Sequence, residues 1–333
     1  MKRWMIGGAC LLALVLAAPG SAQTRAKAQN VPEIAMESVP NFFKMPENVY
    51  FGESMGVATN SKGHIFVYHR RDDTRLFEFD ENGTFVKEWG EGIYGFEFAH
   101  KVRVDKDDNV WVVDEGTNMV IKFNPEGRVL MVLGRRPEAV EGAVETPAGD
   151  PPPDERYLFG RPTDVAWDAQ GNIFVADGLG NARIAKFTKD GAFVKSWGQR
   201  GTANGEFASV NSIAVDAQGN VYAADAGNQR IQVFDNDGTF KSEIKGVGNA
   251  QAICITPAPN QVMYVSNSNL PTDIDTAGEI NKMRLDGTMI GKFGRAGKLP
   301  KEFGTVNAID CRSESTLYVG EIGNFRVQKV TMK

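Results

Sequence analysis

The fold is decided by residues 211–240, which read NSIAVDAQGNVYAADAGNQRIQVFDNDGTF. An alternating apolar strand runs to Asp216, a second strand covers 221–224 and a third covers 230–234. Gly-, Asn- and Asp-rich turns separate them, and the turn at 236–238 leads into a fourth strand. Alternation with such turns is typical of an antiparallel meander. The stretch therefore predicts four consecutive short strands.

The same unit recurs along the chain. Clear copies lie at 55–85, 100–127 and 163–193, and looser copies begin at Gln251 and Asn307. Four short strands in each unit of ~40–50 residues are typical of propeller blades. The chain is therefore predicted to be all-β, a six-bladed β-propeller. Another all-β solenoid is the alternative.

The ends of the repeat array predict how the propeller closes. The last copy stops after its third strand, at 330–333. An unpaired edge there would invite aggregation, so residues 37–45 are predicted to add the outermost strand of the last blade. A single propeller is thus expected over 37–333. A loop at 135–158 is inserted between blades two and three, and 268–278 lengthens a hairpin in blade five.

The N-terminus is typical of an export signal. Lys2 and Arg3 precede an apolar run over 5–18, which small residues follow. This run is shorter than the ~20 residues that a membrane-spanning helix needs. Residues 1–22 are predicted to be a signal peptide and 23–36 a flexible segment. The mature protein is expected to be periplasmic or secreted and monomeric, with no membrane insertion.

Charge excludes one class of partner, and cysteine usage leaves one question open. The net charge is −5, and no basic stripe with interleaved aromatics is present, so nucleic acid is not an expected partner.

Beyond the signal peptide the cysteines are Cys254 and Cys311, on innermost strands of neighbouring blades. Either they face each other and can form a disulfide, or they point apart.

Aligned copies give one residue at the start of each innermost strand. In a propeller these positions surround the mouth of the central channel. The six positions are Met55, His100, Thr163, Asn211, Gln251 and Asn307. Four of them are uncharged and polar, which suits a neutral polar or amide-bearing ligand. A channel that holds water between small polar groups is the alternative, and both stay open.

Most second strands end on an acidic residue. The positions are His69, Asp114, Asp177, Asp225 and Glu321, and Arg75, Arg183, Arg230 and Arg326 begin the third strands. A circle of acids would suit a cation such as calcium. A carboxylate–arginine pair within each blade is the favoured interpretation. Blade two has Met119 where the arginine is expected, so Asp114 and Glu115 are expected to be free. With His100 they are the candidate metal ligands.

Four further segments resemble a known family. They are 68–72 (YHRRD), 98–100 (FAH), 159–165 (FGRPTDV) and 176–178 (ADG). With the repeats over 55–333, they resemble the NHL family of propellers and, within it, the peptidyl-α-hydroxyglycine α-amidating lyases. The resemblance implies an exported zinc enzyme that cleaves a hydroxyglycine-extended peptide to an amide and glyoxylate. It places Arg70 on the family's active-site arginine and His100 on its first zinc-binding histidine.

The remaining chemistry of that family does not carry over. The resemblance implies three zinc histidines, a catalytic tyrosine, an arginine and an acid, and the positions here are His100, Asn211, Asn307, Leu179, Ala226 and Ala308. Neutral asparagine is a poor zinc ligand compared with imidazole or thiolate. Arg70 and His100 are therefore the catalytic candidates, and neither zinc nor calcium has a complete ligand set.

The sequence thus predicts an exported propeller that binds a peptide or small polar ligand at its channel mouth. The candidate binding residues are Met55, His69, Arg70, His100, Thr163, Leu179, Asn211, Gln251 and Asn307. One alternative is a lyase like the amidating enzymes, or another metal-assisted lyase or hydrolase, at the same mouth. Another is a platform that docks an extracytoplasmic protein.

Overall fold

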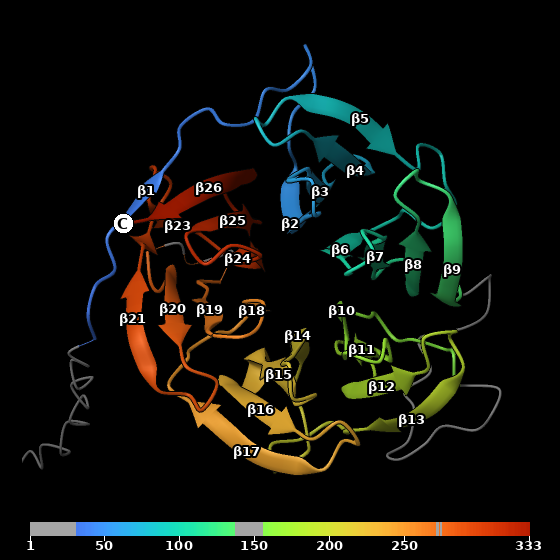
Figure 1. Ribbon diagram of the computed structural model, residues 1–333. Coiled ribbons are helices and arrows are strands. Elements are labelled where there is room, and N and C mark those ends of the chain that lie inside the picture. Colours follow the sequence, from blue (N-terminus) through green and yellow to red (C-terminus); the bar gives the residue numbers. More distant parts are fainter. Residues whose placement is uncertain (1–30, 137–155, 271–272, 274) are drawn as a thin grey trace, which may run out of the picture. The chain divides into compact units, whose positions relative to one another are not determined.

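The computed structural model describes residues 31–136, 156–270, 273 and 275–333. Six four-stranded antiparallel sheets are arranged as blades around a central axis (Figure 1). The predicted all-β, six-bladed propeller is confirmed. The predicted signal peptide and most of the 135–158 loop lie outside the described residues. None of the described elements is a helix long and apolar enough to cross a membrane.

Each blade runs from an innermost to an outermost strand. Blade one contains β2 (Glu53–Thr59), β3 (Ile65–Arg70), β4 (Thr74–Phe79) and β5 (Phe85–Trp89). Blade two contains β6 (Ala99–Val104), β7 (Val110–Asp114), β8 (Met119–Phe123) and β9 (Val129–Gly134). Blade three contains β10 (Asp164–Trp167), β11 (Ile173–Asp177), β12 (Arg183–Phe187) and β13 (Phe193–Trp197).

The second half of the chain repeats this order. Blade four contains β14 (Val210–Val215), β15 (Val221–Asp225), β16 (Arg230–Phe234) and β17 (Phe240–Lys245). Blade five contains β18 (Ile253–Ile255), β19 (Met263–Asn267), β20 (Glu279–Met283) and β21 (Met289–Phe293). Blade six contains β24 (Val306–Asp310), β25 (Thr316–Glu321), β26 (Arg326–Met332) and β1 (Met36–Ser38). The short elements are η1 (Ala226–Asn228), β22 (Arg295–Ala296) and β23 (Glu302–Phe303).

The core lies between neighbouring blades, where the buried side chains of one blade pack against those of the next. Phe66 and Trp89 of blade one pack with Val110 and Phe123 of blade two in one buried cluster. Each such side chain stabilises the fold by roughly 1.5–3 kcal/mol when fully buried. The blades are therefore rigid supports for the residues at their inner ends.

The N-terminal strand closes the last blade, as predicted. Met36 pairs with Met332 and Ser38 with Val330. The strand is shorter than the predicted 37–45, and Lys44 instead makes a parallel bridge to Thr84 of blade one. Residues 31–36, which the sequence placed in a flexible segment, are also held in place. The amide of Ile34 donates to the carbonyl of Lys292 in β21 at 2.8 Å.

A disulfide joins blades five and six. Cys254 lies in β18 and Cys311 directly follows β24, with their Cα atoms 5.9 Å apart. Of the two arrangements left open by the sequence, the cysteines adopt the facing one.

The innermost strands share an irregularity at their first residues. The pairing with the second strand shifts by one residue in β2, β6, β14 and β24. The extra residues are Met55, His100, Asn211 and Asn307. A β-bulge redirects the side chain of the extra residue. A β-bulge therefore sets the side-chain direction of four of the six predicted mouth residues.

Candidate ligand site at the channel mouth

The structure brings the predicted mouth residues together. The Asn307 side-chain amide donates to the carbonyl of Met55 at 2.8 Å and to that of His100 at 3.2 Å. The His100 Nδ1 donates to the Thr163 carbonyl at 2.6 Å. Burial and the neighbouring Lys101 hold the pKa of His100 well below its usual range. His100 is therefore a neutral imidazole whose Nδ1 is already used.

The remaining ring residues also make hydrogen bonds between neighbouring blades. Thr163 Oγ1 donates to the carbonyl of Val210 at 2.6 Å, which links blades three and four. Asn211 Nδ2 donates to Gln251 Oε1 at 2.6 Å, which links blades four and five. Gln251 is partly exposed and the other five ring residues are buried. The ring thus ties the blades together and leaves few polar groups free.

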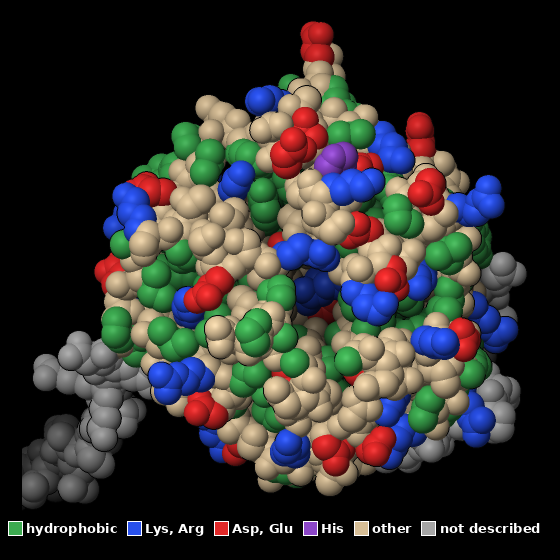
Figure 2. Space-filling view, viewed as in Figure 1, with side chains coloured by type: hydrophobic (Ala, Val, Ile, Leu, Met, Phe, Trp, Pro, Cys, Tyr) green, Lys and Arg blue, Asp and Glu red, His purple; other side chains and the backbone are tan. Residues whose placement is uncertain are grey.

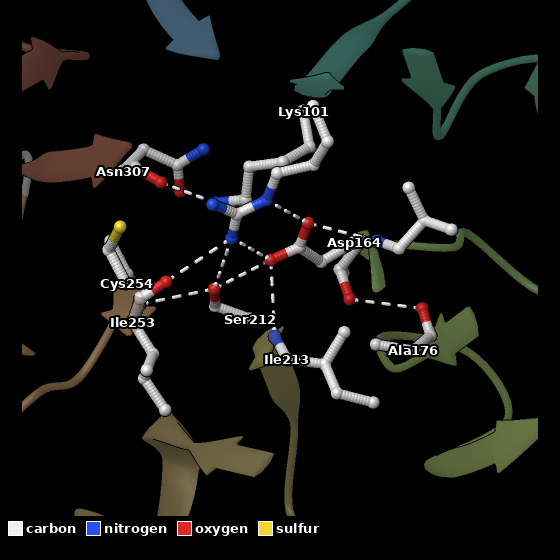
Figure 3. A network of polar contacts seen from close by, with 12 residues as sticks. Lys101, Asp164, Ala176, Ser212, Ile213, Ile253, Cys254 and Asn307 are labelled. Carbon is white, nitrogen blue, oxygen red and sulfur yellow. Dashed lines mark hydrogen bonds and ion pairs between the residues drawn. The ribbon is translucent and has the colours of Figure 1, made fainter. Parts of the chain in front are cut away.

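A second layer of polar residues crosses the channel, and sequence analysis missed it. We call Lys101, Arg103, Asp164 and Ser212 the axial network (Figure 3). Arg103 donates from Nε to Asp164 Oδ1 at 2.9 Å and from Nη2 to Oδ2 at 2.6 Å. Ser212 Oγ donates to Asp164 Oδ2 at 2.6 Å and accepts from the Ile253 amide at 3.1 Å. Blades two, three and four therefore meet at one carboxylate, and Ile253 of blade five bonds to Ser212 and Arg103 beside it.

Lys101 reaches across the channel to blade six, where its Nζ donates to the Asn307 carbonyl. Its side chain is only 1 % exposed. Burial lowers the pKa of Lys101 to about 7, with Asp164 opposing the shift and Arg103 adding to it. Burial alone would raise the pKa of Asp164, but the charge and hydrogen bonds of Arg103 more than offset it and lower the pKa. The ion pair between Arg103 and Asp164 is therefore favoured inside the channel.

Beside the ring lies a group that we call the arginine cluster, made of Arg70, Glu115, Arg161 and Phe98. Arg70 Nη1 donates to Glu115 Oε1 at 3.1 Å, and Arg161 Nη2 approaches the same oxygen at 3.5 Å. The Arg70 guanidinium lies 3.5 Å from the centre of the Phe98 ring. Arg70 also pairs with Glu53 at 2.7 Å. The cluster joins the inner ends of blades one, two and three.

Glu115 is the unusual member of this cluster. Its Oε2 atom is buried and has no hydrogen-bond partner among the described residues. Burial raises the pKa of Glu115, and the charges of Arg161 and Arg70 oppose this shift. A buried acceptor without a partner is unfavourable by roughly 1–3 kcal/mol. Glu115 therefore keeps one acceptor that no described residue satisfies.

Two other predicted residues are engaged by their neighbours. His69 is 2 % exposed and contacts the rings of Phe51 and Phe77. Burial, with help from Arg75, lowers its pKa to about 4. The Leu179 carbonyl accepts from Arg200 at 3.0 Å, and its side chain is partly exposed.

The acids at the ends of the second strands are structural. Arg183, Arg230 and Arg326 pair within their own blades with Asp177, Asp225 and Glu321, at 2.9, 3.0 and 2.7 Å. The predicted carboxylate–arginine pair is confirmed in these three blades. The expectation that Asp114 and Glu115 are free is wrong. Glu115 pairs with Arg70 at 3.1 Å, and Asp114 accepts from the Tyr68 hydroxyl and from four backbone amides. The donors are Glu97, Phe98, Gly116 and Thr117.

The three positions that the resemblance assigns to zinc are engaged in hydrogen bonds in this structure. The side-chain nitrogens of Asn211 and Asn307 are committed to oxygen acceptors, as is the Nδ1 atom of His100. Over the described parts of the chain, no three His, Cys, Asp or Glu residues are grouped to hold a metal ion. The candidate ligands His100, Asp114 and Glu115 are likewise not grouped in this way.

A cavity of about 750 Å³ lies at the opposite ends of the innermost strands. Trp111, Trp167, Asp168 and Lys122 are among its lining residues. This cavity lies away from the mouth, where the functional face is predicted from the sequence. One sequence feature could have predicted the cavity. The turn Asp-Ala-Gln-Gly-Asn occurs twice, at 168–172 in blade three and at 216–220 in blade four, and residues of both turns line the cavity.

A family model described as a 6-bladed beta-propeller matches residues 154–274. The chain is a six-bladed β-propeller. This propeller is 30% identical over 253 residues to peptidyl-glycine alpha-amidating monooxygenase B of Xenopus laevis, covering 66% of this chain and 27% of the relative. The chain thus spans about a quarter of that relative's length.

Two further relatives align over most of the propeller. NHL repeat-containing protein 3 of Homo sapiens is 27% identical, with 86% of this chain and 81% of the relative covered. Peptidyl-alpha-hydroxyglycine alpha-amidating lyase 1 of Drosophila melanogaster is 27% identical, with 85% and 57% covered. Among solved structures, virginiamycin B lyase from Staphylococcus aureus superposes with a TM-score of 0.59 at 13% identity, covering 90% of this chain and 100% of that one. This last likeness concerns the fold alone.

The zinc positions can be tested by restoring histidine. The double variant Asn211→His, Asn307→His is expected to bind zinc much more tightly than the parent chain, because imidazole is a far better ligand than an amide. Equilibrium dialysis against zinc measures this difference. Turnover of a hydroxyglycine peptide is expected to stay undetectable until Leu179→Tyr is added. Robust turnover by the parent chain would contradict this interpretation.

Proposed function

We propose that this propeller binds, at its channel mouth, a peptide or another small polar ligand that offers an N–H donor. The buried Oε2 of Glu115 carries the proposal, because it is an acceptor to which no described residue donates, and a donor supplied by a ligand would satisfy it. The aligned relatives support the class of ligand, since the Drosophila enzyme's name describes an activity on peptides.

The rest of the arginine cluster supports an amide-bearing ligand. The Arg161 side chain is 56% exposed, and its ion contact with Glu115 is long, at 3.5 Å. It can turn to a carbonyl or carboxylate of the ligand. Phe98 is 42% exposed and gives an apolar surface next to it. A peptide unit supplies an N–H for Glu115 and a carbonyl for Arg161 at neighbouring positions.

We further infer that this binding takes place outside the cytoplasm. The disulfide between Cys254 and Cys311 supports a periplasmic or secreted location, because such bonds persist in oxidising compartments.

The test uses a library of N-acetylated tripeptides and the variant Glu115→Gln. We expect wild-type protein to bind some members and the variant to bind them about 10–100-fold more weakly, since a hydrogen bond to a charged group contributes about 1.5–3 kcal/mol. Affinity is also expected to fall as the pH decreases through the raised pKa of Glu115, because the protonated acid is a weaker acceptor. Isothermal titration calorimetry measures both effects.

The matched control is Glu243→Gln, which removes a carboxylate on the outermost strand of blade four. It is expected to bind the same tripeptides as wild type. Equal affinities of wild type and Glu115→Gln would show that the ligand does not use Glu115. A library without a single binder would overturn the peptide proposal.

A further inference from the structure

When Lys101 is protonated, the axial network carries more positive than negative charge. Lys101 and Arg103 extend into the channel, and Asp164 is the carboxylate that they share. The oxygens of Asp164 already accept from Arg103, from Ser212 Oγ, and from the amides of Val165 and Ile213. Asp164 therefore has little capacity left for Lys101.

Asp310 is a further carboxylate that acts on Arg103. Its two oxygens accept from the Thr59 amide at 2.9 Å and the Thr59 hydroxyl at 3.0 Å. Asp310 is therefore directed toward blade one, and it forms no ion pair with Lys101 among the described residues.

Both cations keep unused hydrogen-bond donors. An ammonium group has three N–H donors, and Lys101 Nζ has one acceptor among the described residues, the Asn307 carbonyl. Arg103 Nη1 makes no hydrogen bond to any described residue, although Nε and Nη2 are fully engaged. Because Lys101 is 1 % exposed, bulk water cannot readily satisfy it.

We propose that the channel binds a small monovalent anion, a halide or a carboxylate, between Lys101 Nζ and the guanidinium of Arg103. The anion would complete the donors of both cations and balance the surplus charge. Figure 2 shows that the face viewed there is hollowed at its centre, with Lys and Arg side chains at the rim and inside the hollow. This site is separate from the arginine cluster and does not depend on the ligand proposed there.

Crystallography of the wild-type protein with bromide gives the direct test. Crystals soaked in sodium bromide are expected to show an anomalous peak in contact with Lys101 Nζ and Arg103. A second soak in bromide plus excess sodium acetate distinguishes the two sources of anion. Loss of the peak with acetate density in its place assigns a carboxylate site, and persistence of the peak assigns a halide site. Density that fits only water in both soaks would overturn the proposal.

Solution measurements provide a matched pair of variants. Thermal unfolding is followed while chloride replaces a bulky sulfonate anion at constant ionic strength. We expect the melting temperature of wild type to rise with chloride, since a ligand that binds only the folded state stabilises it. Lys101→Met is expected to lose this response. Lys186→Met removes another buried lysine, whose Nζ donates to Asn236, and is expected to retain it.

The response also has an expected pH dependence. The pKa of Lys101 lies near 7 without an anion, because burial disfavours the ammonium form. Anion binding requires that form, so the chloride effect is expected to be larger at pH 6 than at pH 9. Equal chloride responses of wild type and Lys101→Met at both pH values would contradict the proposal, whatever the crystals show for other sites.

Discussion

Replacing Asp164 with alanine is expected to lower the free energy of unfolding by about 3–5 kcal/mol, because the change leaves Arg103, whose side chain is 16 % exposed, without its counter-ion. Asp164 is fully buried and accepts hydrogen bonds from Nε and Nη2 of Arg103. The variant also removes the acceptor of Ser212 Oγ and of the Ile213 amide. Urea unfolding measures the loss.

Two controls separate the ion pair from a general effect of losing a carboxylate. Asp107→Ala removes an exposed acid paired with Lys106 and is expected to change stability by less than about 0.5 kcal/mol. The double variant Arg103→Met, Asp164→Leu is expected to lose less than Asp164→Ala, because it leaves no arginine without its counter-ion. A loss below about 1 kcal/mol for Asp164→Ala would contradict the role assigned to the axial network.

Removing the disulfide is expected to have the second large effect. The bond closes a loop with a sequence separation of 57 residues. A loop of that length restricts the unfolded chain enough to stabilise the folded state by about 4 kcal/mol in the chain-entropy description. The double variant Cys254→Ala, Cys311→Ala should therefore unfold at clearly lower urea concentration.

The reduced wild-type protein is the matched control, because it keeps both side chains and lacks only the bond. It is expected to lose nearly as much stability as the alanine variant. Should the reduced protein unfold at the same urea concentration as the oxidised one, the bond would contribute nothing and the chain-entropy argument would fail here.

The architecture was predictable from the sequence because turn chemistry and alternation repeat in every blade. The mouth ring was also predictable, since one bulge position recurs in the aligned copies, as at His100 and Asn307. The closing strand was predicted in the correct blade but several residues too long. The error arose because residues after Ser38 cross to blade one, where Lys44 pairs with Thr84.

The axial network was not predicted, although a signal was present. Lys101 and Arg103 alternate with valines in a strand expected to be buried on all sides, and such charges require a partner. The partner, Asp164, belongs to the next blade, so the rotation between blades decides the contact and local patterns do not show it. Asp114 was misjudged for a related reason. Without an arginine in its blade, it binds backbone amides instead.

The axial network also makes the propeller's closure depend on charge as well as on packing. Lys101 and Arg103 of one strand bond to blades six and five, so two neighbouring side chains of β6 connect non-adjacent blades across the centre of the ring. A change of one charge on β6 is therefore felt in blades that β6 does not touch as a strand.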